Sequence, residues 1–339
     1  MKVDVNLINF GPGASPDALL SCWPLMRWLG AAAMVLLAAG LARAEERTMV
    51  TLGTATPGGG FPVYCQAVAE TINGIDPTLE VKTRNTKGST ENVPLLEAGQ
   101  LDLALVQGEV AHEALSGIGR PPARLLILAA MYTTPGMFVV RGDQPYHAIA
   151  DLKGKAVAWG ARGSGLVVLA RYVLDGLGLD MERDFPSIYL DQAGDGPAMV
   201  LDGRAAGLWG GGSGWPGFTA VARGAQGARF IAPSAEERAR IQAKHAFLRT
   251  LTIPAGSYPG QGEPVVSVGS WSFILARPDV PEETAYRLAR ALHRGEPALG
   301  ARLPQARETT AANTVAAAPR PDLIHPGARR YFREIGISP

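Results

Sequence analysis

The sequence predicts an α/β protein built from two domains. Three times along the chain, a short apolar strand leads into a polar or glycine-rich turn and then into apolar residues at helical spacing, over 49–73, 79–96 and 156–177. The strand at 101–106 is almost continuously apolar, which is typical of a parallel strand covered on both faces. At 339 residues, 47% hydrophobic and 19% charged, the chain is long enough for two such domains.

The charge balance argues against two classes of partner. The chain has 32 Lys and Arg and 31 Asp and Glu, so its formal net charge is +1. This balance does not favour binding to nucleic acid or to a membrane surface. The 41 glycines and 26 prolines fall at the boundaries of predicted elements, which indicates many short turns and not disorder.

Residues 1–44 are predicted to be an upstream extension and a targeting segment. From Met26, the run MRWLGAAAMVLLAAGLARA has a positive charge, an apolar stretch and small residues up to Ala44, the outline of a secretory signal peptide. The apolar stretch is shorter than the ~20 residues of a membrane span. We interpret 1–25 as lying before the true translation start, and expect a periplasmic protein that begins near Glu45.

The first strand-to-helix junction is the turn from Thr54 to Gly60, with Pro62 in the first turn of the helix. Backbone N–H groups at a helix start have no intrahelical partner, and the helix dipole adds partial positive charge. A glycine turn there can hold a carboxylate or a phosphate. A tight turn with no ligand is the alternative for any single junction.

The second junction offers short polar donors. Ser89 follows Gly88 in the position of an N-cap, although Pro94 interrupts the predicted helix. Gln107 and Glu109 come directly after the apolar strand at 101–106. Ligands of open α/β sheets collect beyond the carboxyl ends of strands, so both residues are candidates for ligand binding.

The third junction lies in the second half of the fold, where Gly163, Ser164 and Gly165 precede a helix. If the two blocks of sequence face each other, the helix starts converge on one cleft. Three such junctions in two blocks favour a ligand site over coincidental turns. Trp209 and Trp215 flank a glycine-rich loop further on. Their side chains are equally expected to pack within this loop or to form a wall of the cleft.

The remaining elements follow from apolar runs and amphipathic spacing. The predicted strands are 124–132, 136–142, 187–191, 207–211, 229–233 and 265–276, and the predicted helices are 281–294, 304–318 and a last one after residue 326.

Five motifs, in this order, carry a resemblance: GTATPGGGF, GSTENVPLLEAGQLDLALVQGEVA, GSG, YPGQGEPV and HPGARRYFREIG. With them the chain resembles the TAXI family of extracytoplasmic solute receptors, which serve tripartite ATP-independent periplasmic (TRAP) transporters. The resemblance implies the type II periplasmic-binding-protein fold, with two α/β domains and a ligand cleft between them. It also implies a small acidic solute such as glutamate or a dicarboxylate, a membrane permease as partner, and a monomer.

The resemblance also implies domain limits and contacts. Domain I would comprise 45–137 and 256–339, and domain II 138–255, with crossing strands near 136–141 and 268–275. The ligand-binding residues would be Thr54, Gly59, Gly60, Phe61, Ser89, Asn92, Gln107, Glu109, Gly163, Ser164 and Gly165, to which we add Trp215 as a candidate cleft wall.

Some positions depart from the family pattern. Phe61 stands where the family often has Tyr, Glu109 where it commonly has Asp, and Leu166 where it commonly has Thr. The Gly- and Trp-rich segment 207–217 also departs from it. These changes make the expected pocket less polar, so an acid less hydrophilic than glutamate is expected.

The signatures of an enzyme are missing. The turn at 53–59 has P-loop-like glycine spacing without the lysine, and neither Ser164 nor Ser213 lies in GxSxG. The five His are isolated, and Cys65, expected to be a small buried hydrophobe, would be the one cysteine after export. We predict no catalytic residue, no metal and no cofactor. An enzyme on the same fold, or a periplasmic sensor for a signalling partner, stays the alternative.

Neutral donors are expected to hold the acid. Arg162 precedes the third turn, but a flexible glycine loop positions a long side chain poorly, so we place it at the cleft rim. The expected donors are the N–H groups around Gly59, Gly60 and Ser164, the hydroxyls of Thr54 and Ser89, and the amide of Asn92.

Overall fold

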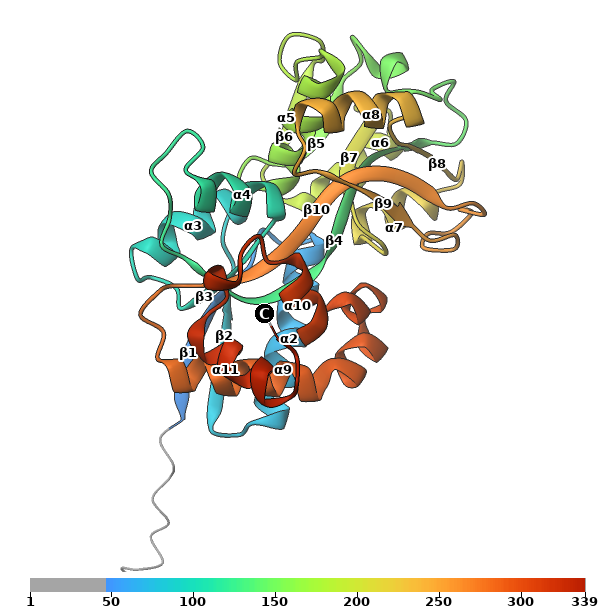
Figure 1. Ribbon diagram of the computed structural model, residues 1–339. Helices are drawn as coiled ribbons and strands as arrows, with labels where there is room; N and C mark the ends of the chain where they lie inside the picture. Colours follow the sequence, from blue (N-terminus) through green and yellow to red (C-terminus); the bar gives the residue numbers. More distant parts are fainter. Residues whose placement is uncertain (1–46, 339) are drawn as a thin grey trace, which may run out of the picture. The chain divides into compact units, whose positions relative to one another are not determined.

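The computed structural model describes residues 47–338, and the predicted signal peptide lies outside the described residues. Ten strands pair along the path β2-β1-β3-β10-β4-β7-β5-β6, with β8 beside β4 and β9 beside β10 (Figure 1). The strands are β1 Thr48–Gly53, β2 Leu79–Arg84, β3 Leu103–Val106, β4 Leu126–Arg141, β5 Val157–Ala161, β6 Ser187–Leu190, β7 Gly207–Gly211, β8 Ala228–Ile231, β9 Arg249–Ile253 and β10 Val265–Ala276.

Two groups of parallel strands lie at the ends of this path. β2, β1 and β3 pair in parallel at one end, and β7, β5 and β6 at the other. We call the part built on β1–β3 lobe I and the part built on β5–β8 lobe II. The helices are α2 Gly60–Ile75, α3 Ser89–Glu97, α4 Gly108–Ser116 and α9 Glu282–Arg302, α10 Ala311–Ala317, α11 Pro326–Glu334 in lobe I, and α5 Gly165–Leu177, α6 Gly196–Leu201, α7 Pro216–Ala222 and α8 Ala235–Lys244 in lobe II.

The long strands β4 and β10 connect the lobes (Figure 1). They pair antiparallel from Leu126 with Ala276 to Pro135 with Gly269. Beyond this point β4 pairs with β7 and β8, whereas β10 pairs with β9. The crossing strands expected from the sequence are therefore β4 and β10. The two domain boundaries stay a prediction.

The prediction of two separate strands at 124–132 and 136–142 is wrong, because β4 runs without interruption through Pro135. Pro135 falls where β4 exchanges β10 for β7, and a residue without an N–H is tolerated at such an irregular position. The helix expected at 304–318 is likewise two elements, a 3₁₀ turn at Pro304–Glu308 and α10. α9 extends past the expected end at Arg294 to Arg302, through Pro297.

The core is divided between the lobes. α2, α9 and α11 bury apolar side chains against β1, β3 and β10, and the fully buried Cys65 is part of this cluster, as expected from its place on α2. In lobe II, Phe138, Trp159 and Trp209 pack edge to face, with ring centroids 5.6 Å apart for the first two and 4.8 Å apart for Phe138 and Trp209. α3 and α4 pack in a further cluster against β3, β4 and β10.

Candidate functional site

A pocket lies between the lobes, at the first turns of α2, α3, α4 and α5. Its cavity volume is about 60 Å³. The lining residues are Ala55, Thr56, Gly59, Gly60, Phe61, Lys87, Gly88, Ser89, Gln107, Tyr132, Thr134, Gly160, Ala161, Ser164, Gly165, Leu166, Ala193, Gly211 and Trp215.

One part of the wall is polar and joins three helix starts. Ser89 begins α3, Gln107 is the N-cap of α4, and Gly165 begins α5. The Ser89 hydroxyl accepts the Gln107 backbone N–H at 3.0 Å. A Cβ added to Gly165 would lie 3.0 Å from the Ser89 Oγ and 2.5 Å from the Gln107 Cβ. Gly165 therefore lets α5 of lobe II approach α3 and α4 of lobe I directly.

The Gln107 side chain is buried in this polar part. Gln107 is only 2% exposed, and its amide nitrogen Nε2 is covered by protein among the described residues. The amide oxygen Oε1 is the atom beside Gly165, 3.1 Å from a Cβ added there. The side chain interacts with the Glu109 carboxyl group behind it and lowers the pKa of that group, so the amide nitrogen faces Glu109.

A second part of the wall is aromatic and surrounds the start of α2. The Phe61 and Tyr132 rings meet edge to face with centroids 6.4 Å apart. A Cβ added to Gly60 would lie 3.2 Å from the Trp215 ring and 3.8 Å from the Tyr132 hydroxyl. Burial raises the pKa of Tyr132, so its hydroxyl stays neutral. This hydroxyl and the Trp215 indole N–H have no protein partner in the described chain.

The loop before α7 is held so that Trp215 faces the pocket. The Tyr258 hydroxyl accepts the Trp215 backbone N–H at 3.1 Å and donates to the Gly212 carbonyl at 2.5 Å. Tyr258 belongs to the YPGQGEPV motif, which has a structural role here. Trp209, in contrast, is buried in the lobe II core, where its indole N–H donates to the Leu166 carbonyl at 2.8 Å.

Two direct contacts between the lobes lie beside lining residues of the pocket. At one contact, Thr90 donates to the Gly163 carbonyl from both its backbone N–H, at 3.2 Å, and its hydroxyl, at 3.1 Å. At the other, the Ala193 N–H donates to the Thr56 hydroxyl at 3.3 Å, and the Gly194 N–H to the Pro57 carbonyl at 3.4 Å.

Glycines make these contacts possible. Cβ atoms added to Gly58 and Gly163 would lie 2.5 Å from Gly194 Cα and 2.4 Å from the Lys87 carbonyl oxygen, closer than real Cβ contacts allow. Gly88 has φ 118°, in the region that favours glycine, and a Cβ there would lie 2.6 Å from the Gly163 carbonyl oxygen. We call these two contacts the glycine seam.

Eight of the twelve predicted site residues line the pocket: Gly59, Gly60, Phe61, Ser89, Gln107, Ser164, Gly165 and Trp215. The other four do not, and they are Thr54, Asn92, Glu109 and Gly163. Gly163 lies in the glycine seam beside the pocket. Ser89 is the first residue of α3 and not its N-cap, because Gly88 takes that position and the Ser89 hydroxyl turns to Gln107.

Asn92 has a structural role in this arrangement. Its buried amide donates to the carbonyls of Thr54 and Leu105, both at 2.8 Å, and so ties the ends of β1 and β3 to α3. The amide is therefore already used by the protein. Thr54 is also fully buried, behind the turn, and its hydroxyl does not reach the pocket wall.

Glu109 lies behind Gln107, between α4 and β10. Its carboxyl group is completely buried and accepts the Ser270 hydroxyl at 2.7 Å. Burial raises the pKa of Glu109 to about 7, although the Ser270 hydrogen bond opposes this effect. Ser270 is opposite Thr134 in the β4 and β10 pair, so Glu109 borders the crossing strands.

The wall contains a cation that the sequence argument overlooked. Lys87 lines the pocket and is the one charged residue among the lining residues of the described chain. Arg162 is exposed and lies over the Tyr189 ring at 4.3 Å, outside the lining. The other wall residues absent from the predicted site include Tyr132, Thr134 and Leu166. Tyr132 and Thr134 come from β4, where an apolar strand pattern gave no local signal of a site.

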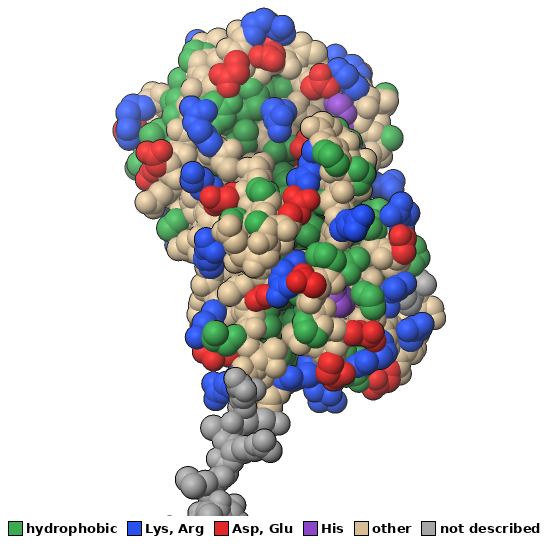
Figure 2. All heavy atoms as spheres, turned by 90° about the vertical axis from the view of Figure 1, so that its left-hand side faces the viewer, with side chains coloured by type: hydrophobic (Ala, Val, Ile, Leu, Met, Phe, Trp, Pro, Cys, Tyr) green, Lys and Arg blue, Asp and Glu red, His purple; other side chains and the backbone are tan. Residues whose placement is uncertain are grey.

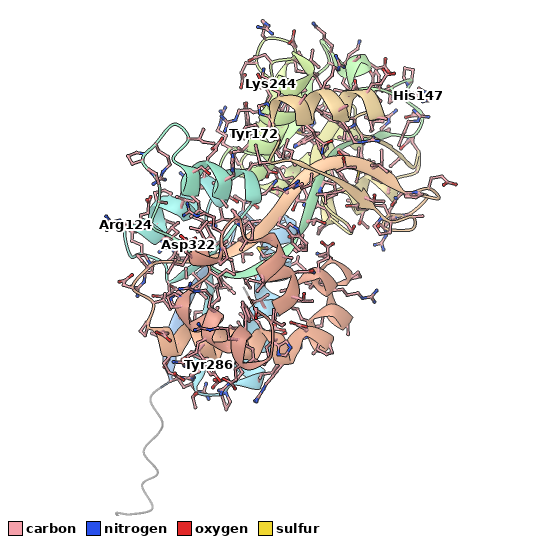
Figure 3. All side chains as sticks on the ribbon, in the orientation of Figure 1. Arg124, His147, Tyr172, Lys244, Tyr286 and Asp322 are labelled. Atoms are coloured by element: carbon pink, nitrogen blue, oxygen red, sulfur yellow. The ribbon has the colours of Figure 1, made fainter. Side chains whose placement is uncertain are left out.

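A further contact joins the lobes along α4 and α5. Tyr172 of α5, labelled in Figure 3, donates its hydroxyl to the Glu113 carboxylate of α4 at 3.1 Å. The Tyr172 ring packs against Phe247, with centroids 5.0 Å apart, and Phe247 stacks on His112 at 4.0 Å.

Two features are absent from residues 47–338. No group of His, Cys, Asp and Glu there has the arrangement of a metal site. In the same range, no helix is both long and apolar enough to span a bilayer. Acidic and basic side chains are interspersed on the face shown in Figure 2.

The fold places the chain in the class of two-lobed α/β proteins with a pocket between the lobes. It belongs to the NMT1-like family, which matches residues 52–336. A protein of Bordetella bronchiseptica RB50 shares 15% identity and a TM-score of 0.54, over 86% of this chain and 99% of that one. MatC from Rhodopseudomonas palustris with bound malate shares 14% identity and a TM-score of 0.52, over 85% and 96%. These likenesses confirm the predicted fold class.

Proposed function

We propose that the protein is the extracytoplasmic receptor of a TRAP transporter, binds a small carboxylate in the pocket and delivers it to a membrane permease. The observation that carries the proposal is the convergence of four helix starts on a pocket that the buried Ser89 hydroxyl lines. The five motifs of the TAXI resemblance support the TRAP assignment. The protein would act as a periplasmic monomer, and its chemistry would be binding alone.

Neutral groups would carry most of the recognition. The Ser89 hydroxyl already accepts the Gln107 N–H, which leaves its own proton free for a ligand. The backbone N–H groups of Ser89 and Gly165 are at helix starts, where they have no intrahelical acceptor. Together with the Ser89 hydroxyl they form a compact set of donors for one carboxylate, and hydrogen bonds to a charged acceptor are the strong ones.

Closure of the lobes would trap the solute. β4 and β10 are the strands that cross between the lobes in the sheet, and a hinge needs only a few residues to change their backbone angles. The glycine seam gives the closed state hydrogen bonds that an open state lacks. A ligand that bridges both lobes favours the closed state, because it makes contacts there that it cannot make when the lobes separate.

A capture experiment tests the proposed partner. The tagged protein is incubated with detergent-solubilised membranes of the producing cells, with and without small acids, and captured membrane proteins are identified by mass spectrometry. The proposal expects the integral-membrane subunits of a TRAP transporter. Capture of an ABC permease would contradict the TRAP assignment, and capture of a signalling kinase would show the sensor alternative. A Gly163→Ala variant, which cannot form the Gly163 contact of the glycine seam, serves as the matched control.

A further inference from the structure

We infer that the solute is a monoanion with a flat apolar body, such as an aromatic monocarboxylate, and not a dicarboxylate or an amino acid. The inference rests on the proposed function and assigns its substrate class. Two features of the pocket wall support it. One part of the wall can bind a single anion, and the part next to it is aromatic.

The anion site lies in the polar part of the wall. Ser89, Gln107 and Gly165 bring three helix starts together, and the Ser89 hydroxyl, 1% exposed, accepts the Gln107 N–H and keeps its own proton for a ligand. The start of a helix attracts negative charge, and three helix starts favour an anion at the same position in this pocket. Lys87 lines the pocket, is exposed, and adds a screened attraction.

The start of α2 is a poor second anion site. Its third residue is Pro62, which has no N–H to offer to an anion. Phe61, Tyr132 and Trp215 surround it with aromatic surface. A second carboxylate placed there would lose its hydration without gaining a cation, which is strongly unfavourable.

The aromatic enclosure fits a ring. Trp215 and Tyr132 are each at most 6% exposed and Phe61 is half-buried, so their ring faces and edges are held by the protein. Leu166 extends the apolar wall on the lobe II side, where a Cβ added to Gly211 would lie 3.3 Å from its side chain. Aromatic side chains prefer edge-to-face or offset contacts with another ring, beyond the gain from burying apolar area.

An ammonium group finds no acidic partner in this wall. In the described chain, no Asp or Glu lines the pocket. The Glu109 carboxyl group lies behind Gln107, outside the lining, and is bonded to Ser270. An α-amino acid would therefore bury its ammonium group without a carboxylate beside it, a cost that a simple acid avoids.

Calorimetry on the purified protein with five probes tests the inference: benzoate, benzenesulfonate, benzamide, succinate and glutamate. We expect benzoate or benzenesulfonate to bind at least about tenfold more tightly than succinate and glutamate, and benzamide to bind more weakly than either aromatic anion. The two aromatic anions separate a carboxylate solute from a sulfonate solute. Tighter binding of succinate or glutamate overturns the inference and leaves the proposed function standing. Binding of benzamide alone, or of none of the five probes, overturns both.

A substitution pair checks that the pocket wall sets the preference. Leu166→Thr adds a hydroxyl to the wall and should lower the ratio of aromatic to glutamate affinity at least several-fold. Leu177→Thr is the matched control, because Leu177 is on the same helix, is also half-buried and packs against the same core, but does not line the pocket. The aromatic and glutamate affinities are measured on the same variant. A general loss of stability would lower both affinities and leave their ratio unchanged. Equal ratios in both variants would contradict the assignment of Leu166 to the solute site.

Discussion

Ser89 joins two parts of the site at the scale of a single residue. It begins α3, and its hydroxyl holds the N–H of Gln107 at the start of α4. The same hydroxyl keeps a free proton that points to no other protein acceptor in the described chain. The residue therefore connects the fold to the proposed ligand through one oxygen atom.

Replacing Ser89 by Ala should weaken binding of the solute by about one to two powers of ten, because a hydrogen bond to a charged group is worth roughly 1.5–3 kcal/mol. Arg162→Ala should change affinity much less, since Arg162 is exposed over Tyr189, and its effect should fade at high salt. Calorimetry at low and high salt ranks the two. Loss of binding in Arg162→Ala with an unaffected Ser89→Ala would establish an arginine clamp instead.

Glu109 should make stability depend on pH. Its pKa in the folded protein is raised from 4.5 to about 7 by burial, so the folded state holds a proton that the unfolded state has lost. The free energy of unfolding therefore falls as pH rises from about 4.5 to about 7, by on the order of 3 kcal/mol from this group.

Glu109→Gln should abolish this part of the decline and leave the protein at least as stable as the wild type above pH 7. Denaturant unfolding at pH 5, 6, 7 and 8 measures it. The exposed Glu236 of α8 provides the control Glu236→Gln, which should keep the wild-type pH dependence. The same slope in Glu109→Gln and in the wild type would show that Glu109 is ionised throughout.

At the scale of elements, the turn glycines serve closure as well as ligand approach. Gly163 sits against the Lys87 backbone only because it has no Cβ. The contact joins the turn before α5 to the turn before α3, so the same segments that offer N–H groups to a solute also touch each other. Sequence alone identified these turns, because strand, glycine turn and helix follow one another locally in the chain.

Gly163→Ala should weaken solute binding about tenfold or more, because overpacking of this kind costs about 1–3 kcal/mol and falls on the closed state. The ligand-free protein should unfold at nearly the wild-type temperature, since the seam lies outside both lobe cores. Gly262→Ala, where an added Cβ meets nothing within 4 Å, is the control. Wild-type affinity in Gly163→Ala would mean that the seam is not part of the ligand-bound state.

Other parts of the wall could not be predicted from local pattern. Tyr132 and Thr134 are residues of β4, and they reach the pocket only because β4 lies beside β10 and ends against β7. The family resemblance implied that Asn92 contacts the ligand, but its amide joins β1 to β3. Strands that are neighbours in the sheet but far apart in the sequence decide the role of each polar group. They determine whether the group faces a ligand or bonds to a strand.

At the scale of the whole molecule, we expect the protein to be more compact with bound solute than without it. Small-angle scattering at saturating solute should give a smaller radius of gyration than without it, because the lobes turn about the crossing strands and meet at the glycine seam. The Gly163→Ala variant should compact less. An unchanged radius in the wild type at saturation would contradict closure about a hinge.

Mass spectrometry of the small molecule released when the exported protein is denatured tests the central claim most directly. We expect one organic acid with a single negative charge, bound in a near-equimolar amount to the wild-type protein. The amount bound to Ser89→Ala should be much lower. A neutral or cationic compound at that occupancy, or the same acid retained fully by Ser89→Ala, would contradict a carboxylate held by the neutral donors of this pocket.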